Sequence, residues 1–297
     1  MTGQTAPAPT WHPAPSLPAL RLTAGACDTH CHIFGSQSRF PFPPEAAFRP
    51  ADAPKEKLFA LHAMLGFTRC VIVQSGCHGF DNSAVADALA DKGGAYRGVA
   101  LLPVTVGDAE LERLSGQGFC GVRFNFMKHL GKGAPIEDVI ALAPRLARFG
   151  WHLQIHPESS LLEGMAPLLR LSTVPVVIDH MARVDASLGL EQPAFRTLLA
   201  LMEDDRFWVK VSGSERASRA RPPYADAIPF ARLLVERFPD RVLWGTDWPH
   251  PNFSGPIPDD GQLVDLIAEI APSEAARQAL LVDNPARLYG FTAGGAS

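Results

Sequence analysis

Residues 26–33 read ACDTHCHI, a short run in which His30 and His32 are separated by one residue. On a β-strand, residues two apart point to the same side, so both imidazoles face the same way. Neither a GxGxxG nor a GxxxxGK[ST] phosphate loop follows this run or occurs elsewhere in the chain. The stretch therefore predicts the first strand of a sheet that ends in two histidines and not in a nucleotide-binding turn.

Seven further β-rich runs follow, with helix-like segments between them. The runs are Arg69–Gln74, Tyr96–Pro103, Phe119–Phe126, Trp151–His156, Val174–His180, Phe207–Ser212 and Arg241–Asp247. The helix-like segments include Lys55–Leu65, Asp81–Lys92, Ile136–Phe149, Ser160–Leu171, Pro193–Glu203 and Ile228–Phe238, with Asp81 or Asn82 as an N-cap and closing helices in Ser273–Tyr289. Strand–helix alternation of this length predicts an α/β fold, a single (β/α)8 TIM barrel over residues 23–297, preceded by an extended arm over residues 1–22.

The composition narrows the class of protein. The 297 residues are 46% hydrophobic, and 27 basic against 31 acidic residues give a net charge of −4, with no basic run to suggest nucleic acid or a membrane surface as partner. No apolar stretch reaches the roughly 18 residues that a membrane span needs, and the Pro- and Ala-rich start lacks the pattern of a signal peptide. Five cysteines with no CxxC pair indicate free thiols in a cytoplasmic protein. Cys31 alternates with the two histidines, so we expect it to pack on the opposite face.

Polar side chains gather at the carboxyl ends of the predicted strands, which share one face of a parallel barrel. His30 and His32 alone are compatible with a hydrogen-bonded pair in the barrel interior. His156 at the end of strand five and Asp247 at the end of strand eight complete a set that suits a divalent metal ion. The alternatives are a turn or N-cap role for Asp247 and a purely substrate-contacting role for His156.

Six motifs resemble the amidohydrolase superfamily (amidohydrolase-related family 2), and within it the branch of 2-pyrone-4,6-dicarboxylate lactonases and sulfomuconolactone hydrolases. They are DTHCHIFG at 28–35, QSGCHGFDN at 74–82, GVRFNF at 121–126, DHMAR at 179–183, SGSERAS at 212–218 and WGTDWPHPN at 244–252. The resemblance implies a hydrolase, a lactonase that opens a small acidic cyclic ester in the breakdown of aromatic compounds. In such an enzyme Asp247 would take a proton from the attacking water, and His180 would polarise the carbonyl or only support its neighbours.

The chain departs from the branch at strand five. The best-known lactonases of the branch work without a metal and carry a tyrosine at the position of His156. A histidine here resembles branch members that open muconolactones with a bound divalent ion, so we expect His30, His32, His156 and Asp247 to bind Zn²⁺, with Mn²⁺ as the second choice. A metal-free mechanism stays open.

The resemblance also suggests residues that bind an anionic substrate. Arg123, Arg183 and Arg216 would ring the mouth and hold a carboxylate or sulfonate, although each could instead form a surface ion pair. His78, His129 and His250 are further candidates for substrate contact, and His78 and His250 could equally fix their own loops. The dicarboxylate lactonases have an arginine where this chain reads Met127-Lys128-His129, and a tyrosine where it has Phe48. Both changes weaken the case for pyrone dicarboxylate itself as the substrate.

Three other functions remain compatible with these motifs. A non-hydrolytic, metal-dependent decarboxylase shares the barrel and the metal set, and a sugar-lactone hydrolase or isomerase belongs to the same branch. A catalytically silent binding barrel is disfavoured, because each expected catalytic position carries a competent residue.

Overall fold

Eight parallel strands in sequential order form the centre of the protein. The computed structural model describes residues 7–46, 48–130 and 133–291. The strands are β1 (Cys27–Cys31), β2 (Arg69–Val73), β3 (Tyr96–Ala100), β4 (Phe119–Phe126), β5 (His152–Pro157), β6 (Val176–Ile178), β7 (Phe207–Lys210) and β8 (Val242–Leu243). Thr29 N donates to Trp244 O at 3.0 Å, which joins the first strand to the segment after the last. The predicted barrel is confirmed.

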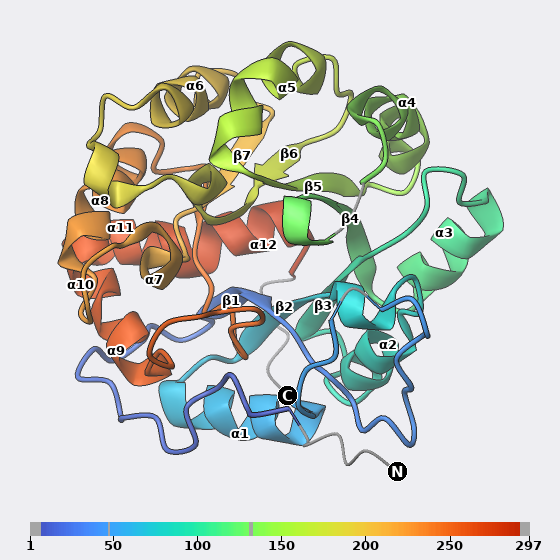
Figure 1. Ribbon diagram of the computed structural model, residues 1–297, viewed down its shortest axis with the longest axis horizontal. Coiled ribbons are helices and arrows are strands. Elements are labelled where there is room, and N and C mark those ends of the chain that lie inside the picture. Colours follow the sequence, from blue (N-terminus) through green and yellow to red (C-terminus); the bar gives the residue numbers. More distant parts are fainter. Residues whose placement is uncertain (1–6, 47, 131–132, 292–297) are drawn as a thin grey trace.

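Helices surround the strands in sequence order (Figure 1). They are α1 (Lys55–Leu65), α2 (Ser83–Ala90), α3 (Asp108–Gly116), α4 (Ile136–Ala147), α5 (Leu162–Leu169), α6 (Pro193–Met202), α7 (Ser214–Ala217), α8 (Ile228–Arg237), α9 (Asp260–Asp265), α10 (Ile267–Ile270), α11 (Glu274–Gln278) and α12 (Asn284–Tyr289). Helix α3 was not predicted. Among the described residues, no helix has the length and apolar character that a membrane crossing requires.

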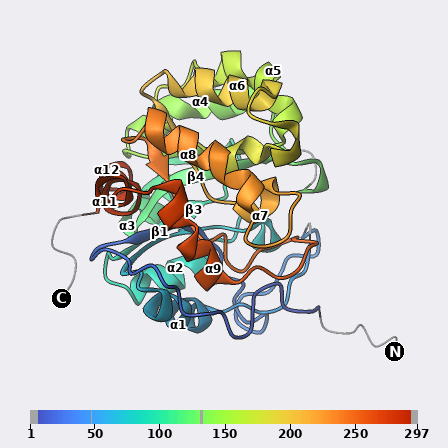
Figure 2. The same cartoon turned by 90° about the vertical axis from the view of Figure 1, so that its left-hand side faces the viewer.

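The two faces of the strands form separate apolar clusters. Side chains such as Ile72 pack outward against the helices, whereas Val71, Val99 and Val177 point into the barrel and meet Tyr289 at the end of α12. Figure 2 shows α11 and α12 on one side of the barrel and α7 on the other. Helix α12 thus covers the amino ends of the strands, and the carboxyl ends are left for a site.

A register shift in β1 places the paired histidines inside the barrel. Cys27 packs with the interior cluster, but Cys31, four residues on, packs with the outer cluster against the helices. The pairing of β1 with β2 changes register between Asp28 and Cys31, and a bulge of this kind reverses the alternation. His30 and His32 consequently face inward, and the predicted outward position of Cys31 is confirmed.

Several boundaries differ from those predicted. Strands β6 and β8 are shorter than expected, because the chain turns at residues 179–183 and 244–247 before reaching the predicted ends. Asn82 occupies the N-cap position of α2 but uses its side chain on Leu101, and Asp81 accepts from Ser83 N at 2.9 Å instead.

The described part of the N-terminal arm contacts the barrel domain. Residues 7–22 of the predicted arm contain no helix or strand, and Leu20 N donates to Asp265 Oδ1 at 2.8 Å. Residues 1–6 of the predicted arm and 292–297 of the predicted barrel domain lie outside the described residues.

Candidate active site

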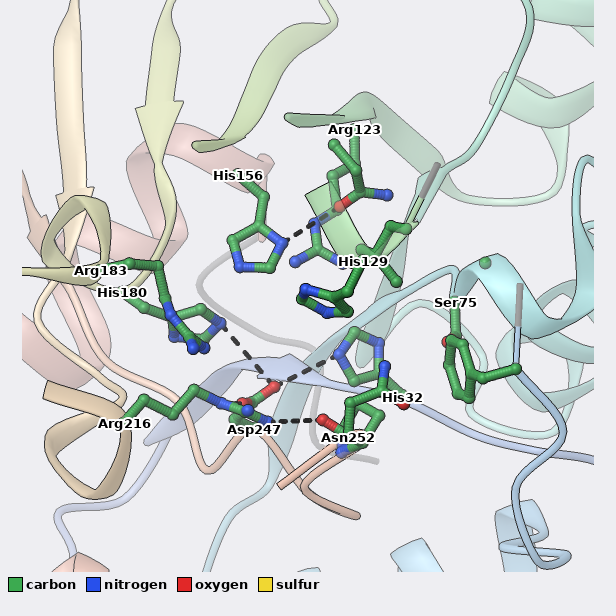
Figure 3. A pocket seen from close by; sticks show the side chains of 15 residues that line it. His32, Ser75, Arg123, His129, His156, His180, Arg183, Arg216, Asp247 and Asn252 are labelled. Atoms are coloured by element: carbon green, nitrogen blue, oxygen red, sulfur yellow. Dashed lines mark hydrogen bonds and ion pairs between the residues drawn. The ribbon is translucent and has the colours of Figure 1, made fainter. Parts of the chain in front are cut away.

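A cavity opens at the carboxyl ends of the strands. Its walls come from nearly every strand end and the loop that follows, and Figure 3 shows their side chains converging. The lining residues are His32, Phe48, Ser75, Gly76, Arg123, Asn125, His129, Leu130, His156, His180, Arg183, Arg216, Asp247, Pro251 and Asn252. The barrel topology therefore brings together residues that lie far apart in the sequence.

Asp247 forms the centre of this site, with its two oxygens in different surroundings. Oδ1 lies 3.3 Å from His32 Nε2 and 3.8 Å from the Nε2 atoms of both His30 and His180. Oδ2 pairs with the guanidinium of Arg216. One oxygen is thus held by a cation, and the other is turned toward three imidazoles, of which Figure 3 shows His32 and His180.

The hydrogen bonds of two histidines indicate where their lone pairs point. His32 Nδ1 lies 2.7 Å from Val73 O and His156 Nδ1 lies 3.1 Å from Asn125 Oδ1. Both oxygens only accept, so each Nδ1 carries a hydrogen, and in a neutral imidazole Nε2 then carries a lone pair. Nε2 of His32 faces an oxygen of Asp247, and a metal ion or a hydrogen between the two atoms would satisfy this contact.

These observations fit a metal ion. The ligand atoms of His30, His32 and Asp247 lie within 4.8 Å of one another. The Nε2 atoms of His30 and His156 are buried without a hydrogen-bond partner in the described part of the chain. The histidine nitrogens and carboxylate oxygen suit Zn²⁺. His156 lines the same cavity but lies outside the three-residue group, so its role as fourth ligand stays a prediction.

The backbone at the site is strained. Asp247 and His180 have φ angles of 60° and 49°, in the left-handed region that non-glycine residues rarely adopt. Gly245, two residues before Asp247, packs so closely on β1 that a Cβ atom there would lie 2.4 Å from His30 N. Packing between the first and last strand ends therefore determines the direction of the Asp247 side chain.

Burial keeps His30, His156 and His180 neutral. It lowers the pKa of His30 and His156 well below the usual value, with the charges of Lys210 and Arg123 acting in the same direction. Burial also lowers the pKa of His180 to about 3, although Asp247 opposes the shift. Neutral imidazoles are the form that binds metals.

The carboxyl group of Asp247, unlike the histidines, is held in its charged form. Its burial favours the protonated form, but the charge of the Arg216 guanidinium outweighs burial and holds the pKa of Asp247 well below its ordinary value. Asp247 is therefore ionised at neutral pH and available as a proton acceptor.

The three predicted arginines all line the cavity, but they differ in their partners. Arg123 Nε donates to Asp179 Oδ2 at 2.9 Å, and Arg216 pairs with Asp247. Arg183 forms no hydrogen bond or ion pair with another described residue. Burial and the neighbouring Arg216 lower its pKa to about 10, which leaves it charged at neutral pH.

The three additional histidines are placed differently from one another. His129 lies on the exposed rim and lines the cavity. His78 is buried against the ring of Phe42, with 4.9 Å between centroids, and His250 Nε2 lies 3.1 Å from Asp260 Oδ1. Neither of these two is among the residues that line the cavity, so their surroundings match the loop-fixing alternatives.

Two buried charges below the cavity were not predicted as site residues. Asp179 and Lys210 are fully buried and both lie next to Nδ1 of His30. Their sequence signals were weak: Asp179 directly precedes His180, and Lys210 is a lone charge at the end of an apolar strand.

The model of the amidohydrolase family matches residues 27–291, which is nearly the whole chain. The chain belongs to this family. Its resemblance to that family, predicted from the motifs, is confirmed.

This amidohydrolase has close relatives of named activity. It is 47% identical to the 2-pyrone-4,6-dicarboxylate hydrolase of Comamonas testosteroni, over 94% of each chain. It is 39% identical to the 4-sulfomuconolactone hydrolase of Hydrogenophaga intermedia, over 93% of this chain and 92% of the other. Among solved structures, a probable 2-pyrone-4,6-dicarboxylic acid hydrolase of Acinetobacter baumannii with bound citric acid shares 27% identity and a TM-score of 0.79, covering 90% of this chain and all (100%) of the other.

Proposed function

We propose that this amidohydrolase opens a small lactone that carries at least one acidic group. The observation that carries the proposal is Asp247 Oδ1 facing three histidine Nε2 atoms at 3.3 to 3.8 Å, beside the guanidinium of Arg183, which has no ion-pair partner in the described part of the chain. Both named relatives hydrolyse acidic lactones, which supports the same substrate class for this chain.

We propose His30, His32, Asp247 and His156 as the ligands of a divalent ion, Zn²⁺ before Mn²⁺. When bound, the ion would supply Lewis acidity for the carbonyl or lower the pKa of water. The neutral histidines and the unpartnered Nε2 atoms of His30 and His156 support this assignment.

The protein's own residues would handle the proton and the developing charge. Asp247 accepts the proton of the attacking water through Oδ1, while Arg216 holds Oδ2 and fixes the carboxylate plane. His180 is held at Nδ1 by Ser212 Oγ at 3.1 Å, so its Nε2 can face the carbonyl oxygen. One such donor is typically worth roughly 3 kcal/mol in the transition state. Arg183 binds the acidic group of the substrate.

The test is turnover of 2-pyrone-4,6-dicarboxylate, 4-sulfomuconolactone, sugar lactones and carboxylated muconate semialdehydes, with ring opening and CO2 release followed separately. We expect ring opening of an acidic lactone, and loss of that activity in Asp247→Asn. Release of CO2 without ring opening would contradict the proposal and favour the decarboxylase. Metal content, with activity after chelation and re-addition, tests the ligand assignment.

A further inference from the structure

His30 Nδ1 lies between an acid and a base deep in the barrel. It is 3.3 Å from Asp179 Oδ1 and 3.2 Å from Lys210 Nζ, and all three side chains are fully buried. The carboxylate oxygen can only accept a hydrogen bond, whereas the ammonium group can only donate one. The two neighbours therefore demand opposite protonation of the same nitrogen.

The remaining bonds of Lys210 leave one hydrogen undecided. Its Nζ donates to Thr29 O and to Gln154 Oε1, each at 2.9 Å. The third N–H can reach His30 Nδ1 or, at 3.6 Å, Asp179 Oδ1. Asp179 Oδ2 is already occupied by Arg123 Nε and Gln154 Nε2, so only Oδ1 remains for His30.

Which of these two contacts His30 Nδ1 makes determines whether Nε2 of His30 carries a hydrogen. A hydrogen on Nδ1, donated to Asp179, leaves the Nε2 lone pair free toward Asp247. A hydrogen bond from Lys210 to Nδ1 instead places the imidazole hydrogen on Nε2, where a metal ion would have to bind. His30 stays neutral in both forms, so one hydrogen changes position and the net charge is unchanged.

We propose that Asp179 and Lys210 are positioning residues that set the tautomer of His30 and thereby its ability to bind a metal ion. Asp179 favours the metal-binding tautomer, and Lys210 favours the tautomer that blocks it. A carboxylate behind a histidine ligand commonly raises metal affinity in this way. The inference deepens the proposed function, because it rests on His30 as a ligand.

Asp179→Asn is the decisive variant, because its orientation is fixed by the neighbours. Arg123 and Gln154 both donate to the Oδ2 position, so the amide oxygen must stay there. The amide NH2 then replaces Oδ1 and donates to His30 Nδ1, which locks the hydrogen on Nε2. Zinc affinity, measured by competition with a chelating dye, is expected to fall about 10- to 100-fold.

A second variant and a control separate this effect from general damage. Lys210→Met removes the competing donor, so its zinc affinity should equal or exceed that of the wild type. Asp260→Asn changes a buried carboxylate beside His250 and should leave zinc affinity unchanged. Imidazole ¹⁵N chemical shifts of the metal-free protein should show His30 protonated at Nε2 in Asp179→Asn and at Nδ1 in Lys210→Met.

Equal zinc affinity of Asp179→Asn and wild type overturns the inference, as does a wild type with no measurable zinc affinity. An equal loss in Lys210→Met overturns it as well. If Lys210→Met does not fold, the ¹⁵N shift of His30 in Asp179→Asn decides alone. None of these readouts needs a substrate, so a failure of lactone hydrolysis by itself counts against the proposed function and not against this inference.

Discussion

Arg183 offers a clean test of how the substrate is bound, because its guanidinium has no partner among the described residues. Removing it leaves no buried acid unpaired. By contrast, removing Arg123 would take from Asp179 its closest cation, and removing Arg216 would do the same to Asp247. In those two cases a loss of activity would mix substrate binding with damage to the site, at a cost of roughly 3–5 kcal/mol for breaking a buried pair.

We therefore predict that Arg183→Met lowers kcat/KM for an acidic lactone about 10- to 150-fold. This range follows from the roughly 1.5–3 kcal/mol that a hydrogen bond to a charged group contributes. The loss should appear mainly in KM, because the acidic group is held in both the ground and transition states. The thermal midpoint should change little, since no internal ion pair is broken.

The assay compares an acidic lactone with an uncharged analogue of the same ring. Arg183→Met should lose activity with the acid and keep it with the uncharged analogue. Arg219→Met is the control, because Arg219 pairs with Asp185 on the surface and its side chain is 64% exposed. Unchanged kcat/KM with the acid, or an equal fall with both lactones, would refute the role given to Arg183.

Three further predictions concern single histidines and the carboxylate. His156→Phe should reduce bound zinc and weaken zinc affinity at least ~10-fold; full occupancy in this variant would remove His156 from the ligand set. Asp247→Asn should lower kcat by about 10²- to 10⁴-fold in a folded protein, and wild-type turnover would exclude it as the base. Burial lowers the pKa of His152 to about 3 in the folded protein. As the pH falls below the ordinary histidine pKa, His152 therefore takes up a proton in the unfolded chain but not in the folded one. The free energy of unfolding therefore falls toward acid pH. His152→Leu removes this group, so the loss in free energy of unfolding between pH 7 and pH 5, measured by urea unfolding, should be smaller than in the wild type by about 2 kcal/mol. An unaltered pH dependence would argue against a neutral buried His152.

Much of the architecture could be predicted from local sequence patterns. The eight alternating units follow from short β-rich runs and amphipathic segments, and parallel topology then brings His30, His156 and Asp247 to one end. The spacing of His30 and His32 predicted a shared direction, which the structure confirms. The bulge after Asp28 has no evident signal in the sequence, because it depends on how β1 pairs with β2.

Side-chain partners were harder to predict than positions. His250 follows the strand-eight motif closely, yet it turns to Asp260 on a later helix. Arg123 and Arg183 belong to successive motifs, but of the two only Arg123 pairs with a buried acid among the described residues. Residues 180–183 adopt left-handed φ angles that local propensity disfavours, so their directions depend on tertiary packing.

The charges at this site connect metal binding to substrate choice. Arg123 and Arg216 each form an ion pair with an acid, whereas Arg183 forms none with the residues that the structure describes. A divalent ion beside Asp247 would add further positive charge next to buried side chains, where charges are weakly screened. An anionic lactone offsets that excess and an uncharged one does not. We therefore expect a bound metal ion and an acidic substrate each to strengthen the binding of the other.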